Sequence, residues 1–432
     1  MAAVTVPGVN GSAVSYTDIF DTLQNQTLAQ DIANSLAAYF DGDPLNIQSY
    51  VPPPGMTSTA VPSDANELLV TAASDNGAIF TPAGYSFVTD DTGGGSFTVV
   101  GAQNFIGGNG DLTVWDTVGA SSVGGGIDTI AAGNGNDLVG LMPGSTYTVA
   151  AGNGNDTFFA NGSGAIADGD GRSLIFVGSA NGTNIVSSYG TDTIVAATGA
   201  NTVATFGNDS RIFGGTGSLE VFGGSATDET VAGGSGSETL FSAQSGVYFL
   251  GSSTSLFVGS PSSDSTIIGT TGSETVFGGA SSNELIFNNG SSLVFGSGSH
   301  DSTTIVGGAT PSILFGSAGS AITYFSTASG ALYAAATGNE TLNAAGSAAN
   351  MTVFGGQDPT AGNSLVGGAG NDVLIAGSGS DTMTGGAGDN AFAFIKGAAG
   401  GRHGLQQAAA VAFMLDCDFD RPKLTPDMAD LM

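Results

Sequence analysis

The sequence predicts an all-β protein, a parallel β-roll or β-solenoid with a short N-terminal helical cap. Three observations lead to this fold class. Glycine provides 72 of the 432 residues and proline only 13, without the Gly-X-Y period of collagen. Hydrophobic residues still make up 41% of the chain, so apolar side chains can be buried. Short apolar runs follow glycine-rich turns about every nine or ten residues, which indicates stacked coils of short strands.

The composition divides the chain into four expected regions. They are a helical cap and linker (1–55), a β-rich segment that leads into the array (56–106), the solenoid (107–397) and an atypical tail (398–432). Apolar residues recur at helical steps between residues 17 and 40, which predicts the helix. Such a helix would cover the open end of a repeat array. A helix that binds a partner is the alternative.

The repeat is clearest near the C-terminus, where residues 367–393 read GGAGNDVLI, AGSGSDTMT and GGAGDNAFA. A second group between residues 123 and 159 contains VGGGIDTIA, AGNGNDLVG and AGNGNDTFF. Glycine permits the tight turn that opens each unit. The apolar residue in the eighth position should point into the core. These residues are Ile130, Val139, Phe158, Leu374, Met383 and Phe392.

The units follow the pattern GGxGxDxUx, in which U is apolar, and this pattern resembles the calcium-binding nonapeptide of repeats-in-toxin (hemolysin-type) proteins. The resemblance is closest over 367–393, looser over 123–159 and only periodic elsewhere. It implies Ca²⁺ between successive turns, bound by the sixth-position carboxylate and by loop carbonyls, since calcium takes six to eight hard oxygen ligands. The site residues implied are Asp128, Gly133, Gly135, Asp137, Gly152, Gly154, Asp156, Gly368, Gly370, Asp372, Gly377, Gly379, Asp381, Gly386, Gly388, Asp389 and Asn390.

Turns two units apart should lie on the same side of the roll. The loops that begin at Gly367 and Gly385 should therefore share one ion, and the loops that begin at Ala132 and Ala151 another. The last unit carries its acid in the fifth position and Asn390 in the sixth, where the amide oxygen could still bind a cation. The alternative is that these Asn, Asp and Gly residues simply form good turns without any ion.

The middle of the array keeps the period but loses the aspartate. Glu238, Glu274 and Glu340 follow its glycine turns. We expect these three side chains to be strand-edge or solvent-facing carboxylates and not calcium ligands.

The charge balance is extremely acidic, with 37 Asp and Glu against six Lys and Arg and a net charge of −31. Such a chain repels nucleic acid and anionic lipid, so calcium ions are the expected partner. No apolar run is long enough for a transmembrane helix. The N-terminal residues lack the basic and apolar regions of a cleavable signal peptide. We therefore expect a secreted or cell-surface protein that is exported by another route.

Catalytic motifs are missing from the sequence. His300 and His403 lie outside any H-E-x-x-H motif, and no G-x-S-x-G elbow occurs. This favours a structural or adhesive extracellular protein, such as an adhesin, surface-layer or matrix component. Cell-surface polysaccharide and other copies of the chain are its candidate partners. The alternatives are a polysaccharide-acting β-helix enzyme of the lyase or epimerase type, and an export module of a larger toxin. The resemblance implies that the tail after residue 397 is a secretion signal; a frame-shifted end is the other reading.

Overall fold

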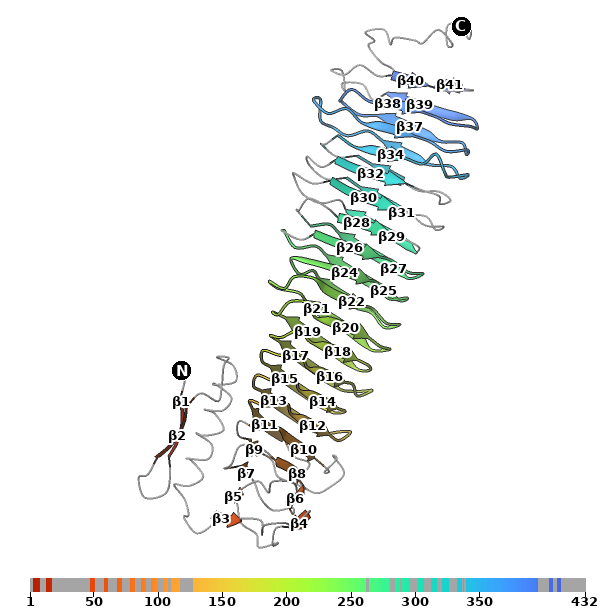
Figure 1. Cartoon of the computed structure of the whole chain (residues 1–432). Helices are drawn as coiled ribbons and strands as arrows, with labels where there is room; N and C mark the ends of the chain where they lie inside the picture. Colours follow the sequence, from red (N-terminus) through yellow and green to blue (C-terminus); the bar gives the residue numbers. More distant parts are fainter. Residues whose placement is uncertain are drawn as a thin grey trace. The chain divides into compact units, whose positions relative to one another are not determined.

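The structure is a computed structural model of the whole chain (Figure 1). It describes residues 3–7, 13–17, 47–50, 58–60, 68–71, 78–81, 87–90, 95–99, 104–107, 110–116, 127–261, 264–279, 284–287, 290–295, 302–306, 312–316, 321–325, 332–335, 337, 339–394, 404–406 and 410–412. They divide between two compact units, residues 1–226 and 227–432.

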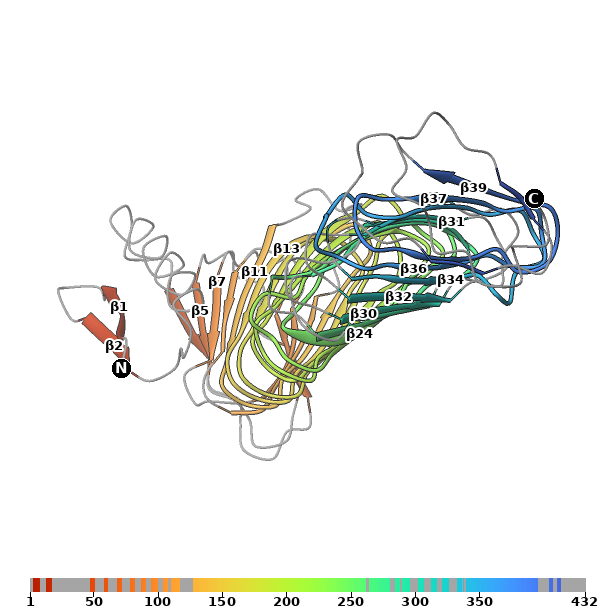
Figure 2. The same cartoon turned by 90° about the horizontal axis from the view of Figure 1, so that it is seen from above.

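Within each unit, every strand of the array pairs in parallel with the strand two places later along the chain. For example, β11 (Ile127–Gly133) pairs with β13 (Thr146–Ala151), and β12 (Leu138–Leu141) pairs with β14 (Thr157–Ala160). Odd-numbered strands therefore form one sheet and even-numbered strands form the other. The two sheets face each other across the coil, as the view from above shows (Figure 2). This confirms the predicted all-β parallel solenoid. The expected helical cap lies outside the described residues.

The first unit contains the following strands. The odd-numbered sheet holds β3 (Ile47–Tyr50), β5 (Leu68–Thr71), β7 (Phe87–Asp90), β9 (Asn104–Ile106), β11, β13, β15 (Ser163–Asp168), β17 (Thr183–Ser188), β19 (Ala200–Thr205) and β21 (Ser218–Phe222). The even-numbered sheet holds β4 (Ser58–Ala60), β6 (Ala78–Thr81), β8 (Gly95–Val99), β10 (Leu112–Asp116), β12, β14, β16 (Leu174–Val177), β18 (Thr193–Ala196) and β20 (Arg211–Gly214). A separate antiparallel pair is formed by β1 (Ala3–Pro7) and β2 (Ala13–Thr17).

The second unit repeats this arrangement. Its odd-numbered sheet holds β23 (Glu238–Phe241), β25 (Thr254–Val258), β27 (Ser273–Phe277), β29 (Ser291–Phe295), β31 (Ser312–Phe315), β33 (Leu332–Ala334), β35 (Thr352–Phe354), β37 (Val373–Ala376), β39 (Asn390–Phe394) and β41 (Ala410–Ala412). Its even-numbered sheet holds β22 (Glu229–Ala232), β24 (Ser245–Phe249), β26 (Asp264–Ile268), β28 (Glu284–Phe287), β30 (Ser302–Val306), β32 (Ala321–Phe325), β34 (Thr341–Asn343), β36 (Ser364–Val366), β38 (Thr382–Thr384) and β40 (Gly404–Gln406).

Parallel pairing extends beyond the repeats that are obvious in the sequence. In the first unit it begins at β3, which pairs with β5. In the second unit it continues to β40 and β41, which pair with β38 and β39. The four-region division of the chain remains a prediction.

The core between the two sheets consists of the inward side chains of every strand. The six eighth-position residues are all buried, with 3% or less of their surface exposed, as the repeat pattern predicts. Each such side chain contributes roughly 1.5–3 kcal/mol by its removal from water. Because the register is constant, identical positions also stack on the outer face. Phe277, Phe295 and Phe315 are paired in register and form an aromatic stack, with ring centroids 4.8 and 5.2 Å apart.

Candidate metal-binding turns

Each coil has two edges. We call the turns that follow an odd-numbered strand the first edge, and those that follow an even-numbered strand the second edge. Turns 134–137 and 152–156 both lie on the first edge of the first unit, in successive coils. The backbone N–H of Asp137 donates to Oδ1 of Asp156 at 2.7 Å, and the N–H of Gly152 donates to the Gly133 carbonyl oxygen at 2.7 Å. These are the two loops expected to share an ion.

Asp128 does not join them. It is the second residue of β11, so it lies at the other end of that strand, next to the second edge. The described residues do not include its side chain.

The sixth position of the unit forms a row of buried side chains along the first edge. Each backbone N–H in this row donates to the side chain of the following coil. The donor–acceptor pairs are Leu112 to Asp137 Oδ1 (2.9 Å), Asp137 to Asp156 Oδ1, Asp156 to Ser173 Oγ (3.1 Å), Ser173 to Asp192 Oδ1 (2.7 Å) and Asp192 to Ser210 Oγ (3.3 Å). The acceptor that joins one coil to the next is thus either an aspartate or a serine.

The fifth position forms a second, exposed row that runs the opposite way. The N–H of Asn155 donates back to Asn136 Oδ1 at 3.0 Å, and the N–H of Arg172 donates back to Asn155 Oδ1 at 3.1 Å. The sequence interpretation treated these asparagines only as turn formers. The regular spacing of these asparagines in the sequence could have predicted that their side chains bond from coil to coil.

The glycines allow the turns to stack closely. A Cβ on Gly154 would overlap the carbonyl oxygen of Gly135, and a Cβ on Gly171 would overlap that of Gly154. Backbone carbonyls of one turn therefore lie directly against the next turn, where a bound cation would need them.

Two carboxylate oxygens of the sixth-position row have no hydrogen-bond partner. Oδ2 of Asp137 and Oδ2 of Asp156 are both buried and unpaired. Burial, together with the charge of Asp156, raises the pKa of Asp137 to about 8, and burial also raises the pKa of Asp156. Unpaired buried carboxylates are costly unless a cation or a proton neutralises them. Hard oxygen donors of this kind fit Ca²⁺, so Asp137, Asp156 and the loop carbonyls could hold it.

The second unit carries the closest motif matches on both edges. Turns 367–372 and 385–389 stack on the second edge, where the Asp372 N–H donates to Asn390 Oδ1 at 2.7 Å. The carboxylate of Asp372 accepts the N–H of Gly368 at 2.7 Å and that of Met351 at 2.8 Å. The loops that begin at Gly367 and Gly385 are therefore adjacent, as expected. Gly386 and Gly388 both have φ of 81°, a left-handed conformation that favours glycine.

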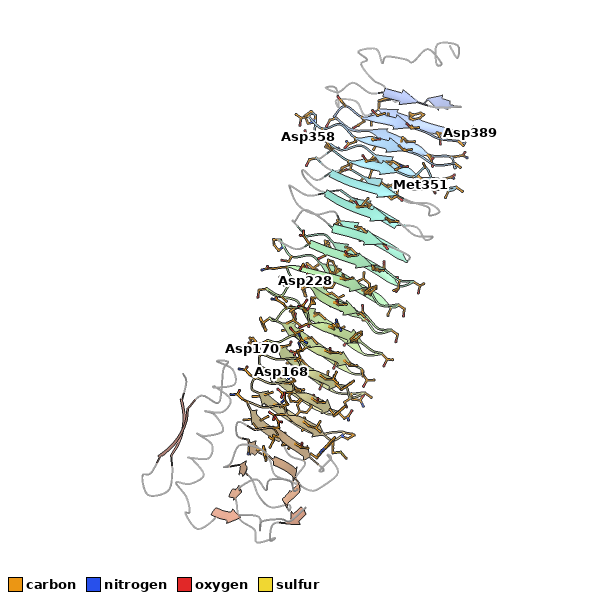
Figure 3. The ribbon with its side chains drawn as sticks, viewed as in Figure 1. Asp168, Asp170, Asp228, Met351, Asp358 and Asp389 are labelled. Atoms are coloured by element: carbon orange, nitrogen blue, oxygen red, sulfur yellow. The ribbon has the colours of Figure 1, made fainter. Side chains whose placement is uncertain are left out.

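Asp381 lies on the opposite, first edge of the same unit. Its carboxylate accepts the N–H of Gly377 at 2.6 Å and the N–H of Asn363 at 3.2 Å. Figure 3 shows the two edges of this region, with Asp358 on one and Met351 and Asp389 on the other. Asp381 therefore cannot share an ion with the Asp372 turn.

The last unit has its acid outside the buried row. Asp389 is exposed, and its N–H donates back to Asn371 Oδ1 at 2.8 Å, which is the bond of a fifth-position residue. Asn390 occupies the buried sixth position. Its amide oxygen stands where the other turns carry a carboxylate oxygen, so this turn offers one charge less to an ion.

Of the two placements expected for the glutamates of the middle coils, strand-edge or solvent-facing, the solvent-facing one is wrong. Glu238, Glu274 and Glu340 have only 4, 2 and 1% of their surface exposed. Oε1 and Oε2 of Glu238 accept the N–H groups of Gly234 (2.5 Å) and Gly251 (2.8 Å). The longer glutamate side chain reaches the backbone of its own turn and of the next coil. Glutamate therefore fills the sixth position and closes the turn with its own carboxylate.

A family model matches some of these turns. The model of the RTX calcium-binding nonapeptide repeat matches four copies, at residues 122–139, 186–218, 262–294 and 360–391. The chain therefore contains RTX (repeats-in-toxin) calcium-binding nonapeptide repeats. Two of the matched copies contain Asp192 and Glu274, in coils where the sequence interpretation found only the period. No curated protein and no solved structure matches the chain.

Two negative findings apply to the described part of the chain. No three His, Cys, Asp or Glu side chains there form a group that could hold a metal ion. Ions between RTX turns would therefore depend mainly on one or two carboxylates and on backbone carbonyls. No helix in the same residues is long and apolar enough to cross a membrane.

Proposed function

We propose that this RTX protein is a secreted structural or adhesive component of a cell surface or extracellular matrix, with a solenoid ordered by Ca²⁺. RTX repeats in a parallel solenoid fit a calcium-binding structural protein. The stacked turns with unpaired buried oxygens on Asp137 and Asp156 carry the proposal. Cell-surface polysaccharide and other copies of the chain are its candidate partners.

Calcium would stabilise the fold by reducing the repulsion between the negative charges of the chain. With a net charge of −31, the calcium-free chain repels itself. Ions that bind the folded turns and not the open chain convert binding free energy into folding free energy. Extracellular calcium modules bind at about 10⁻⁴–10⁻³ M, so the chain would stay loose in the cytosol and fold outside the cell.

The first test compares circular dichroism and thermal melting of the full chain with and without millimolar Ca²⁺. We expect calcium to increase the strand signal and to raise the melting temperature. Identical spectra and identical melting in both buffers would contradict an ion-ordered solenoid.

The second test concerns export. Two variants, one without residues 402–432 and one without residues 1–16, are expressed and assayed in the medium and at the cell surface. Export that is lost only without the tail supports the proposed route. Export that is lost only without residues 1–16 would require an N-terminal signal instead.

A polysaccharide-acting enzyme remains the alternative, but no observation favours it. A hollow on the second edge of the first unit, between turns 180–183, 198–200 and 216–218, is lined by small, amide and hydroxyl residues. None of these lining residues is an acid or a base.

A further inference from the structure

The coil after the Asp156 turn departs from the RTX pattern. Its sixth-position residue is Ser173, so the usual carboxylate is missing there. Instead, the residue directly before this turn, Asp168, is an acid. Ala150 pairs with Ala167, so the next residues, Ala151 and Asp168, occupy equivalent positions in successive coils. Asp168 therefore replaces a buried alanine at the end of β15 (Figure 3).

Asp168 is buried without a well-formed hydrogen bond. Only 1% of its surface is exposed, and neither Oδ1 nor Oδ2 has a partner of good geometry, although the side chains of Ser173 and Asp192 lie close enough to affect its pKa. Burial, followed by the charges of Asp192 and Asp156, raises its pKa well above the usual range. The carboxyl group thus lies near two other buried acids, one in the preceding coil and one in the following coil.

The unpaired carboxylate oxygens indicate which neighbouring acid could bind the same cation as Asp168. Both oxygens of Asp192 are satisfied, by the Ser173 N–H at 2.7 Å and by the Ser188 hydroxyl at 2.5 Å. Oδ2 of Asp156 is unpaired. Unpaired acceptors are therefore found on Asp156 and Asp168, in adjacent coils of the same edge.

No basic side chain can neutralise this pair from inside the edge. Arg172 and Arg211 are the basic residues of the first unit, and both are exposed to solvent. A buried carboxylate without a counter-charge is too costly to persist, so a cation or protons must compensate it.

We propose that Asp156 and Asp168 bind a divalent cation, Ca²⁺ in a calcium-rich medium, between turns 152–156 and 169–173. The remaining ligands would be backbone carbonyls of these turns and water, as a hard cation prefers. This site lacks the nonapeptide motif at Asp168 and lies outside the RTX-matched residues. It rests on the proposed function in one respect only, namely that the folded solenoid takes up calcium.

The test counts the calcium ions bound per chain by equilibrium dialysis of the full-length protein. Asp168→Asn keeps the shape of the side chain and should bind one ion fewer than the wild type. Asp170→Asn is the matched control, since Asp170 is exposed on the same turn (Figure 3), and should keep the wild-type number. Asp168→Ala restores the residue of the preceding coil and should lose the same ion.

Thermal melting provides the second readout. Because bound calcium stabilises the fold by mass action, the rise of melting temperature with calcium concentration should be shallower for Asp168→Asn than for Asp170→Asn. An unchanged ion count in both Asp168 variants would overturn the site and leave protons as the compensating charge. A wild-type protein that binds no calcium at all would overturn the proposed function as well.

Discussion

Replacing Glu238 by alanine should destabilise the second unit by about 2–4 kcal/mol, at any calcium concentration. The change removes the acceptor for the backbone N–H groups of Gly234 and Gly251, at 2.5 and 2.8 Å. A buried N–H left unpaired, such as that of Gly251, costs about 1–3 kcal/mol, and the part-buried N–H of Gly234 costs less. Part of this is offset, because burial raises the pKa of Glu238 and its removal relieves that desolvation. For a unit of this size, the melting temperature should fall by roughly 5–12 °C.

The assay is thermal unfolding of the full chain by circular dichroism at two calcium concentrations. Glu220→Ala is the control, because Glu220 lies half-buried on β21 and its side chain accepts only a long bond, 3.5 Å from Thr202 Oγ1. It should change the melting temperature little. If the loss in Glu238→Ala grew with calcium concentration, Glu238 would be a calcium ligand, and the idea of an ion-free glutamate turn would be refuted.

Three further predictions concern the aspartate turns. Asp372→Ala and Asp381→Ala should each weaken calcium binding in a calorimetric titration, whereas Glu274→Ala should not; an equal loss in all three would mean that the sites are misplaced. Gly154→Ala should lower the melting temperature, because its Cβ would overlap a carbonyl of the preceding turn; unchanged melting would contradict such close stacking. Calcium affinity should rise with pH up to about 8, the raised pKa of Asp137, because protons compete for its carboxylate; an Asp137→Asn variant with the same pH dependence would exclude this group.

The pH dependence of the calcium-free fold should have the opposite sign. The pKa of Asp137 in the folded protein, about 8, exceeds the ordinary aspartate value of 3.8. Stability from this group is therefore present at low pH and is lost as pH rises through about 8. Calcium reverses the trend, since it binds the deprotonated carboxylate.

The sequence predicted the turns whose spacing is regular. Asp137 and Asp156 recur at a 19-residue interval, and Asp372 and Asn390 at 18, so the repeat alone indicated which loops stack. Such an interval corresponds to one full coil. Neighbours related by one coil follow directly from the period.

The repeat period alone does not predict contacts between the ends of the two sheets. Asp168 ends a strand of one sheet and lies near Asp156 and Asp192, which precede strands of the other sheet. No local motif marks such a residue. The glutamate turns were misjudged for another reason. We expected Glu238 to lie at a strand edge or to face solvent, but its carboxylate bonds to the backbone of its own turn, as the carboxylates of Asp372 and Asp381 do.

The two opposed rows of hydrogen bonds restrict the length of the turns on the first edge of the first unit. The buried row binds forward and the exposed row binds backward, so the two rows together limit how much the length of a turn can vary. Its turns, 134–137, 152–156, 169–173, 189–192 and 206–210, are indeed nearly uniform in length, whereas those of the second edge, 142–145, 161–162, 178–182, 197–199 and 215–217, differ more. Coils can therefore grow at the second edge, where added sequence leaves the rows undisturbed. The coils of residues 367–389 carry the motif on both edges, so neither edge has a turn whose length is free to vary.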